Sequence, residues 1–283
     1  MSVKLLKTIS ETRACIAAAR ERGLSIGLVP TMGALHDGHG VLIRKAREET
    51  GFVVVTIFVN PIQFDRLEDL EKYPRDLDAD LAFCERLGVN AVFAPDAAEM
   101  YPAQLLTSVA VAGISTRLEG EFRPGHFRGV ATVVAKLFNI VLADRAYFGE
   151  KDAQQLAVIQ KMVADLDFQI RIVPVATVRE TDGLAMSSRN RRLSPEQRSV
   201  APLLYQALSE AASLIRSGER SAAAVKQSAL AILASAPEIR VEYFEIVDPT
   251  TFHALDPIAG EVRIAAAAWL GQVRLIDNVS VAL

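Results

Sequence analysis

Residues 30–39 read Pro-Thr-Met-Gly-Ala-Leu-His-Asp-Gly-His and connect a predicted strand to a predicted helix. The apolar run over 25–29 is typical of a buried strand that stops at Pro30. Periodic apolar positions resume at residue 41 and indicate a helix up to about Glu49. Gly33 and Gly38 allow the backbone to bend sharply and to come close to a ligand. The stretch therefore predicts a strand, a tight turn and a helix.

Two histidines lie in this turn. His36 and His39 are three residues apart, so they are expected to project to the same side of the first helical turn. The unpaired amides of that turn suit an anion such as a nucleotide phosphate. A plain turn with capping histidines and a metal bound by the histidine pair remain alternatives. Structural zinc takes four ligands that usually include Cys, and Cys15 and Cys84 lie far away in predicted helices.

Length and composition indicate a two-domain soluble protein. The chain has 283 residues, beyond the usual domain size of roughly 100–150. Its 51% hydrophobic content supports a sizeable core, and its net charge of -3 gives no electrostatic footprint for nucleic acid. No apolar run approaches the roughly 18 residues of a membrane span, and no signal-peptide core is present. We expect a cytoplasmic location, without a membrane or nucleic-acid partner.

Alternating strands and helices in the first part of the chain predict an α/β fold with a doubly wound, mostly parallel sheet. Thr8 with Glu11 forms a capping-box signature, which predicts a first helix ending at Gly23. Further strands are predicted at 52–59, 91–94, 108–111, 145–148 and 170–175, and further helices at 77–87, 130–141 and 153–165. Ligands bind beyond the carboxyl ends of such strands. The segments that follow Val29, Asn60 and Phe148 should therefore converge.

Two other segments stand out. Residues 119–129 break all periodicity and are dense in Arg and Gly, which is typical of a functional loop. The character of the chain changes after Thr177, where a polar segment leads into alanine-rich helices up to about 236. Strand-like runs follow at 241–247, 262–266 and 273–276. We predict a first domain over 1–176 and a smaller C-terminal α+β domain over 177–283.

Six segments, in order, resemble the blocks of the pantoate–β-alanine ligase family. They read PTMGALHDGH, FVNPIQF, YPRD, FRPGHFRGV, FGEKDAQQL and VRETDGLAMSSRNRRL. The first is similar to the family's form of the HIGH motif of class I synthetases and nucleotidyltransferases. The resemblance covers residues 25 to about 193. It implies a Rossmann-like domain that binds nucleotide and pantoate, a C-terminal domain that closes over the active site, and a homodimer.

The resemblance also implies a reaction in two steps. The carboxylate of pantoate attacks the α-phosphorus of ATP and gives pantoyl adenylate and pyrophosphate. The amine of β-alanine then displaces AMP and gives pantothenate, with Mg2+ accompanying ATP. Adenylation gives the carboxylate a good leaving group, and fixed donors must meet the charge that develops on the phosphoryl oxygens.

The resemblance assigns roles to particular residues. His39 is the implied proton donor, and His36, Lys151 and Arg189 are the other catalytic candidates. The implied ATP-binding residues are Met32, Gly33, Ala34, Leu35, His36, Asp37, Gly38, His39, Gly149, Glu150, Lys151, Asp152, Val178, Met186, Ser187, Ser188 and Arg189. Arg189 stands where other branches of the superfamily have lysine, so a guanidinium would clamp phosphate.

Two glutamines match those that hold pantoate in the family, Gln63 and Gln155, and an amide suits a ligand with hydroxyls and a carboxylate. Asn60 and Arg123 are expected near pantoate and β-alanine. Asp80 is the candidate magnesium ligand. Because Ala79 interrupts the acidic segment there, magnesium is expected to contact chiefly the nucleotide phosphates and waters.

Two alternatives of function remain. Another HIGH-motif nucleotidyltransferase would give a stable dinucleotide-like product in place of an amide. A non-catalytic nucleotide-binding regulator would be favoured by loss of the histidines or of the lysine. All three side chains are present, as His36, His39 and Lys151.

Overall fold

The computed structural model describes residues 2–283, and the chain divides into two compact units. One unit comprises the chain up to Glu150 together with Val158–Ala176, and the other comprises Lys151–Ala157 with Thr177–Leu283. The division after Ala176 lies where the composition changes. Residues 151–157, which we placed in the first domain, belong to the second unit, where the side-chain amide of Asn278 donates to the carbonyl of Lys151 (2.9 Å).

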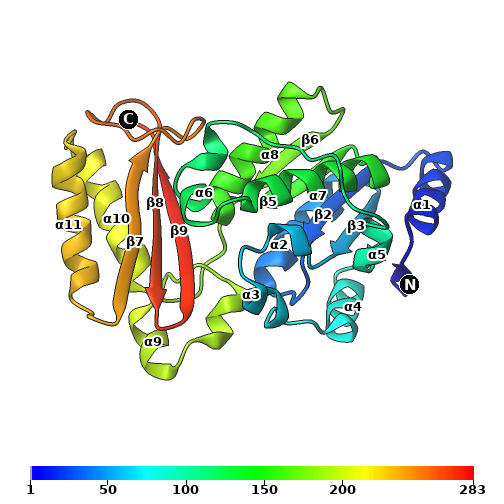
Figure 1. Cartoon of the computed structure of the whole chain (residues 1–283), viewed down its shortest axis with the longest axis horizontal. Helices are drawn as coiled ribbons and strands as arrows, with labels where there is room; N and C mark the ends of the chain where they lie inside the picture. The colour runs from blue at the N-terminus through cyan, green and yellow to red at the C-terminus, as the bar shows by residue number, and fades with distance from the viewer. Residues whose placement is uncertain (1) are drawn as a thin grey trace. The chain divides into compact units, whose positions relative to one another are not determined.

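A parallel sheet forms the centre of the first unit, with the order β1-β4-β3-β2-β5-β6 over the described residues (Figure 1). The strands are β1 (Lys4–Leu6), β2 (Ile26–Thr31), β3 (Phe52–Ile57), β4 (Ala91–Phe93), β5 (Arg145–Gly149) and β6 (Arg171–Val175). β2 pairs with β3 on one side and with β5 on the other, so the strand order reverses beside β2. The predicted doubly wound parallel sheet is confirmed.

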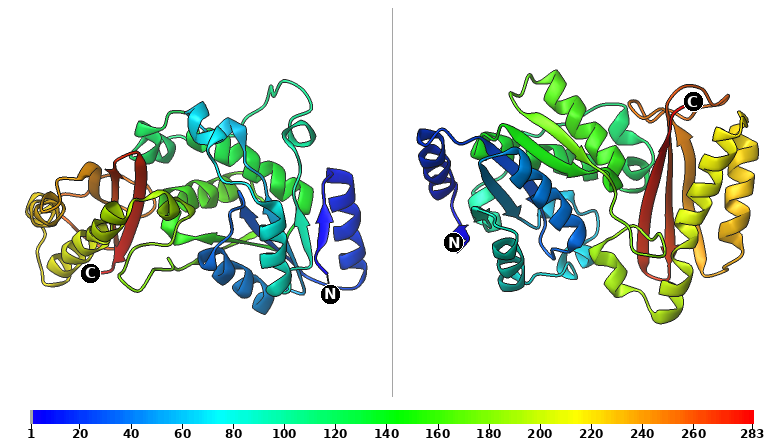
Figure 2. Two further views of the ribbon diagram at one scale, coloured as in Figure 1. Left: turned by 90° about the horizontal axis from the view of Figure 1, so that it is seen from below. Right: turned by 180° about the vertical axis from the view of Figure 1, so that it is seen from behind.

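Helices cover both faces of this sheet. The longer ones are α1 (Ile9–Glu21), α2 (Asp37–Glu49), α4 (Leu77–Arg86), α7 (His126–Val141) and α8 (Ala153–Asp165). The short ones are η1 (Pro61–Gln63), α3 (Leu67–Glu71), α5 (Ala97–Met100), η2 (Ile114–Thr116), α6 (Glu119–Phe122) and η3 (Glu150–Asp152). α7 lies on the opposite face from α2 and α4 (Figure 2). Burial on both faces explains why β3 is a nearly continuous apolar run.

The predicted capping box of α1 is confirmed. The backbone N–H of Glu11 donates to the Thr8 hydroxyl (3.1 Å), and the backbone N–H of Thr8 donates to the Glu11 carboxylate (3.0 Å). Among the described residues, no helix is long and apolar enough to cross a membrane.

The first unit differs from the prediction in its details. The strand predicted over 108–111 is wrong, because Val109 donates its backbone N–H to the Thr132 hydroxyl (3.0 Å) and joins no strand. β1 was not predicted, since three residues are too short for a pattern. α7 begins at His126, four residues earlier than expected, because Gly125 at φ 83° forms its N-cap and the chain turns there.

β2 also continues past the predicted stop at Pro30. Thr31 faces β3, since its carbonyl accepts the backbone N–H of Phe58 (3.1 Å). The nitrogen of Pro30 therefore points toward β5, where pairing has already ended at Leu28. The missing N–H of proline consequently costs the sheet no hydrogen bond.

The second unit contains an antiparallel sheet of order β7-β8-β9, from β7 (Ile239–Val247), β8 (Val262–Leu270) and β9 (Val273–Val281). α10 (Leu203–Arg216) and α11 (Ala222–Ala234) pack on this sheet, and η4 (Ser188–Arg192) and α9 (Pro195–Val200) precede them. The predicted α+β character is confirmed. β8 is longer than predicted because alanines at 265–268 weaken the strand pattern, whereas pairing with both neighbours extends the strand. β9 is longer than predicted because the polar residues Asp277 and Asn278 interrupt the apolar run, whereas pairing with β8 continues to Val281.

Candidate active site

Both histidines of the predicted phosphate turn cap the N-terminus of α2. His36 is the N-cap, and its Nδ1 accepts the backbone N–H of Gly38 (3.1 Å). His39 is the third residue of the helix, and its Nδ1 accepts the backbone N–H of His36 (3.2 Å). The two rings lie with centroids 4.1 Å apart. The prediction that they project to the same side is confirmed, and so is their capping role.

These caps determine the tautomers of both rings. A nitrogen that accepts a backbone N–H carries no proton, so neutral His36 and His39 hold their proton on Nε2. Each ring then offers Nε2–H as a donor, and the two donors come from the same side of one helical turn. Capping and phosphate binding, which we treated as alternatives, are therefore compatible, because capping uses Nδ1 and not Nε2.

A buried carboxylate holds the residues before the helix. Asp80 of α4 accepts the backbone N–H of Ala34 (2.9 Å) and of Leu35 (2.7 Å), and it is 3% exposed. Gly33 and Ala34 both have positive φ, at 83° and 52°. A Cβ on Gly33 would lie 2.8 Å from the Asp80 carboxylate, so glycine is needed at this approach. The expectation of unpaired amides in the first helical turn is corrected at Gly38, because its backbone N–H already donates to His36.

Asp80 thus has a structural role, whereas we suggested it as a magnesium ligand. Both of its oxygens accept backbone bonds, and no cluster of three or more His, Cys, Asp or Glu side chains that could hold a metal exists among the described residues. The nearby Cys84 is also inert, since burial, together with the charge of Asp80, raises the pKa of its thiol to about 12.

Replacing Asp80 with asparagine should destabilise the histidine turn, because an amide NH2 would then face one of two buried N–H groups. We expect a loss of about 1–3 kcal/mol in stability and a several-fold rise in the KM for ATP. Asp78→Asn is the matched control, since Asp78 is exposed on the same helix. Thermal unfolding and ATP titration measure both effects. If excess magnesium restored the activity of Asp80→Asn, the metal assignment would be supported over the structural one.

The predicted pantoate residues of the first unit form a second cluster beside the turn. Asn60 is 1% exposed and donates through Nδ2 to Oε1 of Gln63 (3.0 Å). Gln63 in turn donates through Nε2 to Sδ of Met32 (3.1 Å), which connects this cluster to the histidine turn. Arg123 pairs with Asp65 (3.3 Å) and contacts Nε2 of His126 (3.3 Å), and His126 Nδ1 lies 2.8 Å from the Gln63 carbonyl oxygen. The predicted convergence of the segments after β2 and β3 is borne out.

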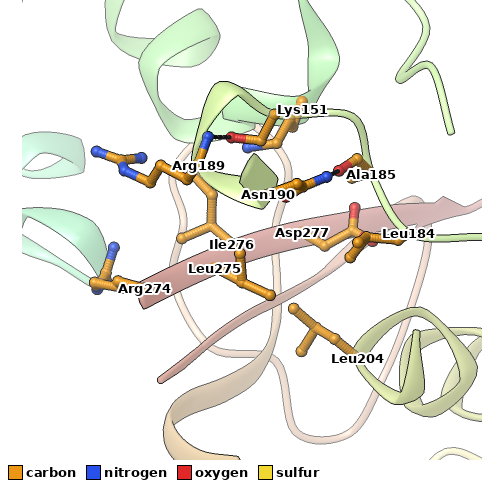
Figure 3. A pocket seen from close by; sticks show the side chains of 11 residues that line it. Lys151, Leu184, Ala185, Arg189, Asn190, Leu204, Arg274, Leu275, Ile276 and Asp277 are labelled. Atoms are coloured by element: carbon orange, nitrogen blue, oxygen red, sulfur yellow. Dashed lines mark hydrogen bonds between the residues drawn. The ribbon is translucent and has the colours of Figure 1, made fainter. Parts of the chain in front are cut away.

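In the second unit, Lys151, Ser187 and Arg189 line one pocket (Figure 3). The other lining residues are Leu184, Ala185, Asn190, Leu204, Arg274, Leu275, Ile276 and Asp277. Neither Lys151 nor Arg189 forms an ion pair within the described residues of this unit. The pocket therefore presents uncompensated positive charge, which suits phosphate oxygens.

A short hairpin, residues 179–185, leads directly to Ser187 and Arg189 of this pocket. Arg179 pairs with Ala185 across the hairpin, donates to both carboxylate oxygens of Asp277 (2.6 and 3.0 Å), and stacks on Tyr205 at 3.8 Å. Arg179 stands in a motif of the sequence but was given no role there, and Asp277 was not predicted. No local signal marks Asp277, because its partner lies 98 residues away in the sequence.

The remaining predicted residues lie as follows. Gly149 ends β5, and Glu150 begins η3, which also contains Lys151 and the exposed Asp152. Gln155 is half-buried near the start of α8. The half-buried predicted residues of the polar segment and η4 are Val178, Met186 and Ser188.

The parallel sheet, with a histidine-capped turn where its strand order reverses, defines an α/β protein of the nucleotide-binding class. The family model for pantoate-beta-alanine ligase matches residues 4–280. The chain therefore belongs to the pantoate–β-alanine ligase family.

Individual relatives agree over nearly the whole chain. A pantothenate synthetase of Moorella thermoacetica is 54% identical over 98% of both chains. The crystal structure of a pantothenate synthetase of Thermus thermophilus has a TM-score of 0.93, with 47% identity over 98% of this chain and 99% of that one. A pantoate-beta-alanine ligase of Francisella tularensis, solved with beta-gamma ATP and beta-alanine, has a TM-score of 0.80 and 32% identity, over 98% and 97% of the two chains.

Proposed function

We propose that this protein condenses pantoate with β-alanine at the expense of ATP, through a pantoyl-adenylate intermediate. Family membership supports the overall reaction. The observation that carries the site assignment is the pair of imidazoles whose Nδ1 atoms both accept backbone N–H groups. Both rings are thereby prepared as Nε2–H donors before any ligand binds.

In the first step, a carboxylate oxygen of pantoate attacks the α-phosphorus of ATP, and pyrophosphate leaves. His36 and His39 donate to phosphoryl oxygens, while Lys151 and Arg189 neutralise phosphate charge. Preorganised donors of this kind stabilise developing charge without reorganising during the reaction. In the second step, the β-alanine amine attacks the acyl carbon and AMP leaves, so orientation of the adenylate matters most.

Pantoate is assigned to Gln63 and Gln155, with Arg123 as a further contact. Magnesium enters as the ion of the Mg–ATP substrate, held by phosphate oxygens and water. Closure of the C-terminal domain over the site, a homodimer and a cytoplasmic location remain part of this proposal.

Mass spectrometry of the products tests the proposal. Protein mixed with ATP, magnesium, pantoate and β-alanine should form pantothenate and AMP in equal amounts, and omission of any one substrate should abolish pantothenate. A His39→Asn variant purified in the same way controls for a contaminating enzyme. A stable product that retains the nucleotide, or formation of ADP, would favour another nucleotidyltransferase or kinase chemistry.

A further inference from the structure

Gln63 lies at one end of a chain of hydrogen bonds that begins at Tyr101. The Tyr101 hydroxyl donates to Oδ1 of Asn60 (2.8 Å), and Nδ2 of Asn60 donates to Oε1 of Gln63 (3.0 Å). Asn60 is 1% exposed and Gln63 is 8% exposed, so water competes little for these groups. All three residues belong to the first unit.

A backbone carbonyl determines which way the side-chain amide of Asn60 is oriented, and therefore which groups donate along these hydrogen bonds. Nδ2 of Asn60 also donates to the carbonyl oxygen of Gly129 (3.2 Å), and a carbonyl can only accept. The nitrogen of the Asn60 amide therefore faces Gly129, which turns its oxygen toward Tyr101. Burial raises the pKa of the Tyr101 phenol, so the hydroxyl keeps the proton that it donates.

Glycine is required at position 129, whose carbonyl accepts the hydrogen bond from Asn60. A Cβ on Gly129 would lie 2.4 Å from the carbonyl oxygen of Ile62 and 2.7 Å from Cα of Gln63. Only glycine lets α7 come close enough to η1 for its carbonyl to reach Asn60. The second glycine of the FRPGHFRGV block, Gly129, is thus required for packing.

The orientation of Asn60 determines that of Gln63. Because Oε1 of Gln63 accepts from Asn60, its NH2 group is the end that faces Met32 in the histidine turn. The thioether sulfur is a weak acceptor, so a ligand oxygen would be a better partner for this NH2 group.

We infer that Tyr101 and Asn60 are positioning residues that hold the NH2 group of Gln63 toward the substrate, so that this position selects a carboxylate or hydroxyl oxygen. An ammonium group, such as that of β-alanine, would meet a second donor there and would be disfavoured. This inference rests on the proposed function, which assigns Gln63 to pantoate. Under this inference, Asn60 positions Gln63 and does not itself contact pantoate.

Tyr101→Phe tests the inference with little change in packing. Phenylalanine keeps the ring, which lies 6.0 Å from the Phe58 ring and 5.6 Å from Nζ of Lys136. The KM and the calorimetric Kd for pantoate should both rise roughly 3- to 10-fold, the scale of one lost hydrogen bond. The KM for ATP and kcat should change by less than about twofold, since the phosphate donors are untouched.

Tyr147→Phe is the matched control. Tyr147 is a buried tyrosine of the same unit whose hydroxyl donates to Glu49 (3.1 Å), away from Gln63. Tyr147→Phe should likewise lose one hydrogen bond of a tyrosine hydroxyl, but the Kd for pantoate should not rise. An equal rise in both variants would mean that Tyr101 acts through general stability, which overturns the inference.

A double-mutant cycle supplies the decisive readout. In a Gln63→Ala background, Tyr101→Phe should weaken pantoate binding by less than about twofold further, because the group that it positions is gone. Effects that multiply independently would overturn the inference, and so would a Tyr101→Phe protein with the wild-type Kd for pantoate. Failure of the proposed function is distinct, since wild-type protein would then neither bind pantoate nor form pantothenate.

Discussion

Replacing His39 with alanine is expected to lower kcat/KM by about 100-fold or more, the scale of losing one preorganised donor in the transition state. Alanine removes two things at once: the Nε2–H donor, and the Nδ1 acceptor that caps the N–H of His36. Affinity for ATP should fall much less than turnover, since the donor matters most while charge develops.

His39→Asn separates these two roles. The Oδ1 atom of asparagine occupies about the place of Nδ1 in histidine, so it can accept the backbone N–H of His36 and keep the cap. No asparagine atom replaces Nε2. We therefore expect His39→Asn to unfold near the wild-type temperature and to be nearly as inactive as His39→Ala. Near-normal turnover in His39→Asn, measured by steady-state kinetics, would show that capping is the main role of the ring.

Replacing Asp277 with alanine is expected to cause the largest loss of stability, about 3–5 kcal/mol, because it leaves the charge of the Arg179 guanidinium without its carboxylate partner. The Asp277 side chain is 3% exposed and that of Arg179 is 18% exposed, so water cannot substitute well for the carboxylate. The unfolding temperature should fall on the order of 10 °C. The KM for ATP should also rise, since Arg179 holds the hairpin that leads to Arg189.

Asp182→Ala is the control for this prediction. Asp182 pairs with Arg198 in the same segment at 2.6 Å, but its side chain is 38% exposed, and exposed pairs contribute only about 0–1 kcal/mol. Thermal unfolding of the two variants should therefore differ clearly. Equal shifts would mean that the Arg179–Asp277 pair adds no more than a surface pair.

Local patterns were sufficient to predict most of the fold. An apolar run that stops at Pro30 identified β2, a β-branched run that ends before Pro61 identified β3, and the Thr8 capping signature identified the start of α1. The patterns failed where pairing overrides propensity. β1 is too short to carry a period, and the backbone N–H of Val109 donates to the Thr132 side chain of α7 instead of to a strand.

The residues of the candidate site likewise fall into those that the sequence could identify and those that it could not. His36, His39, Gln63 and Arg189 stand in motifs and could be named from the sequence. The structural roles of Asp80, Tyr101 and Asp277 could not, because each acts on a residue 41 or more positions away through a contact that only the folded chain creates. The tautomers of the histidines could not be predicted from the sequence either, since they depend on which backbone N–H each Nδ1 accepts.

Exchange of labelled pyrophosphate into ATP tests the central claim most directly, that the site adenylates pantoate before the amine reacts. Protein, magnesium, ATP and pantoate should support this exchange with no β-alanine present, and removal of pantoate should abolish it. His39→Asn should slow the exchange about as much as it slows the full reaction. Exchange that required β-alanine would contradict the account, because attack by the amine would then be needed before pyrophosphate leaves.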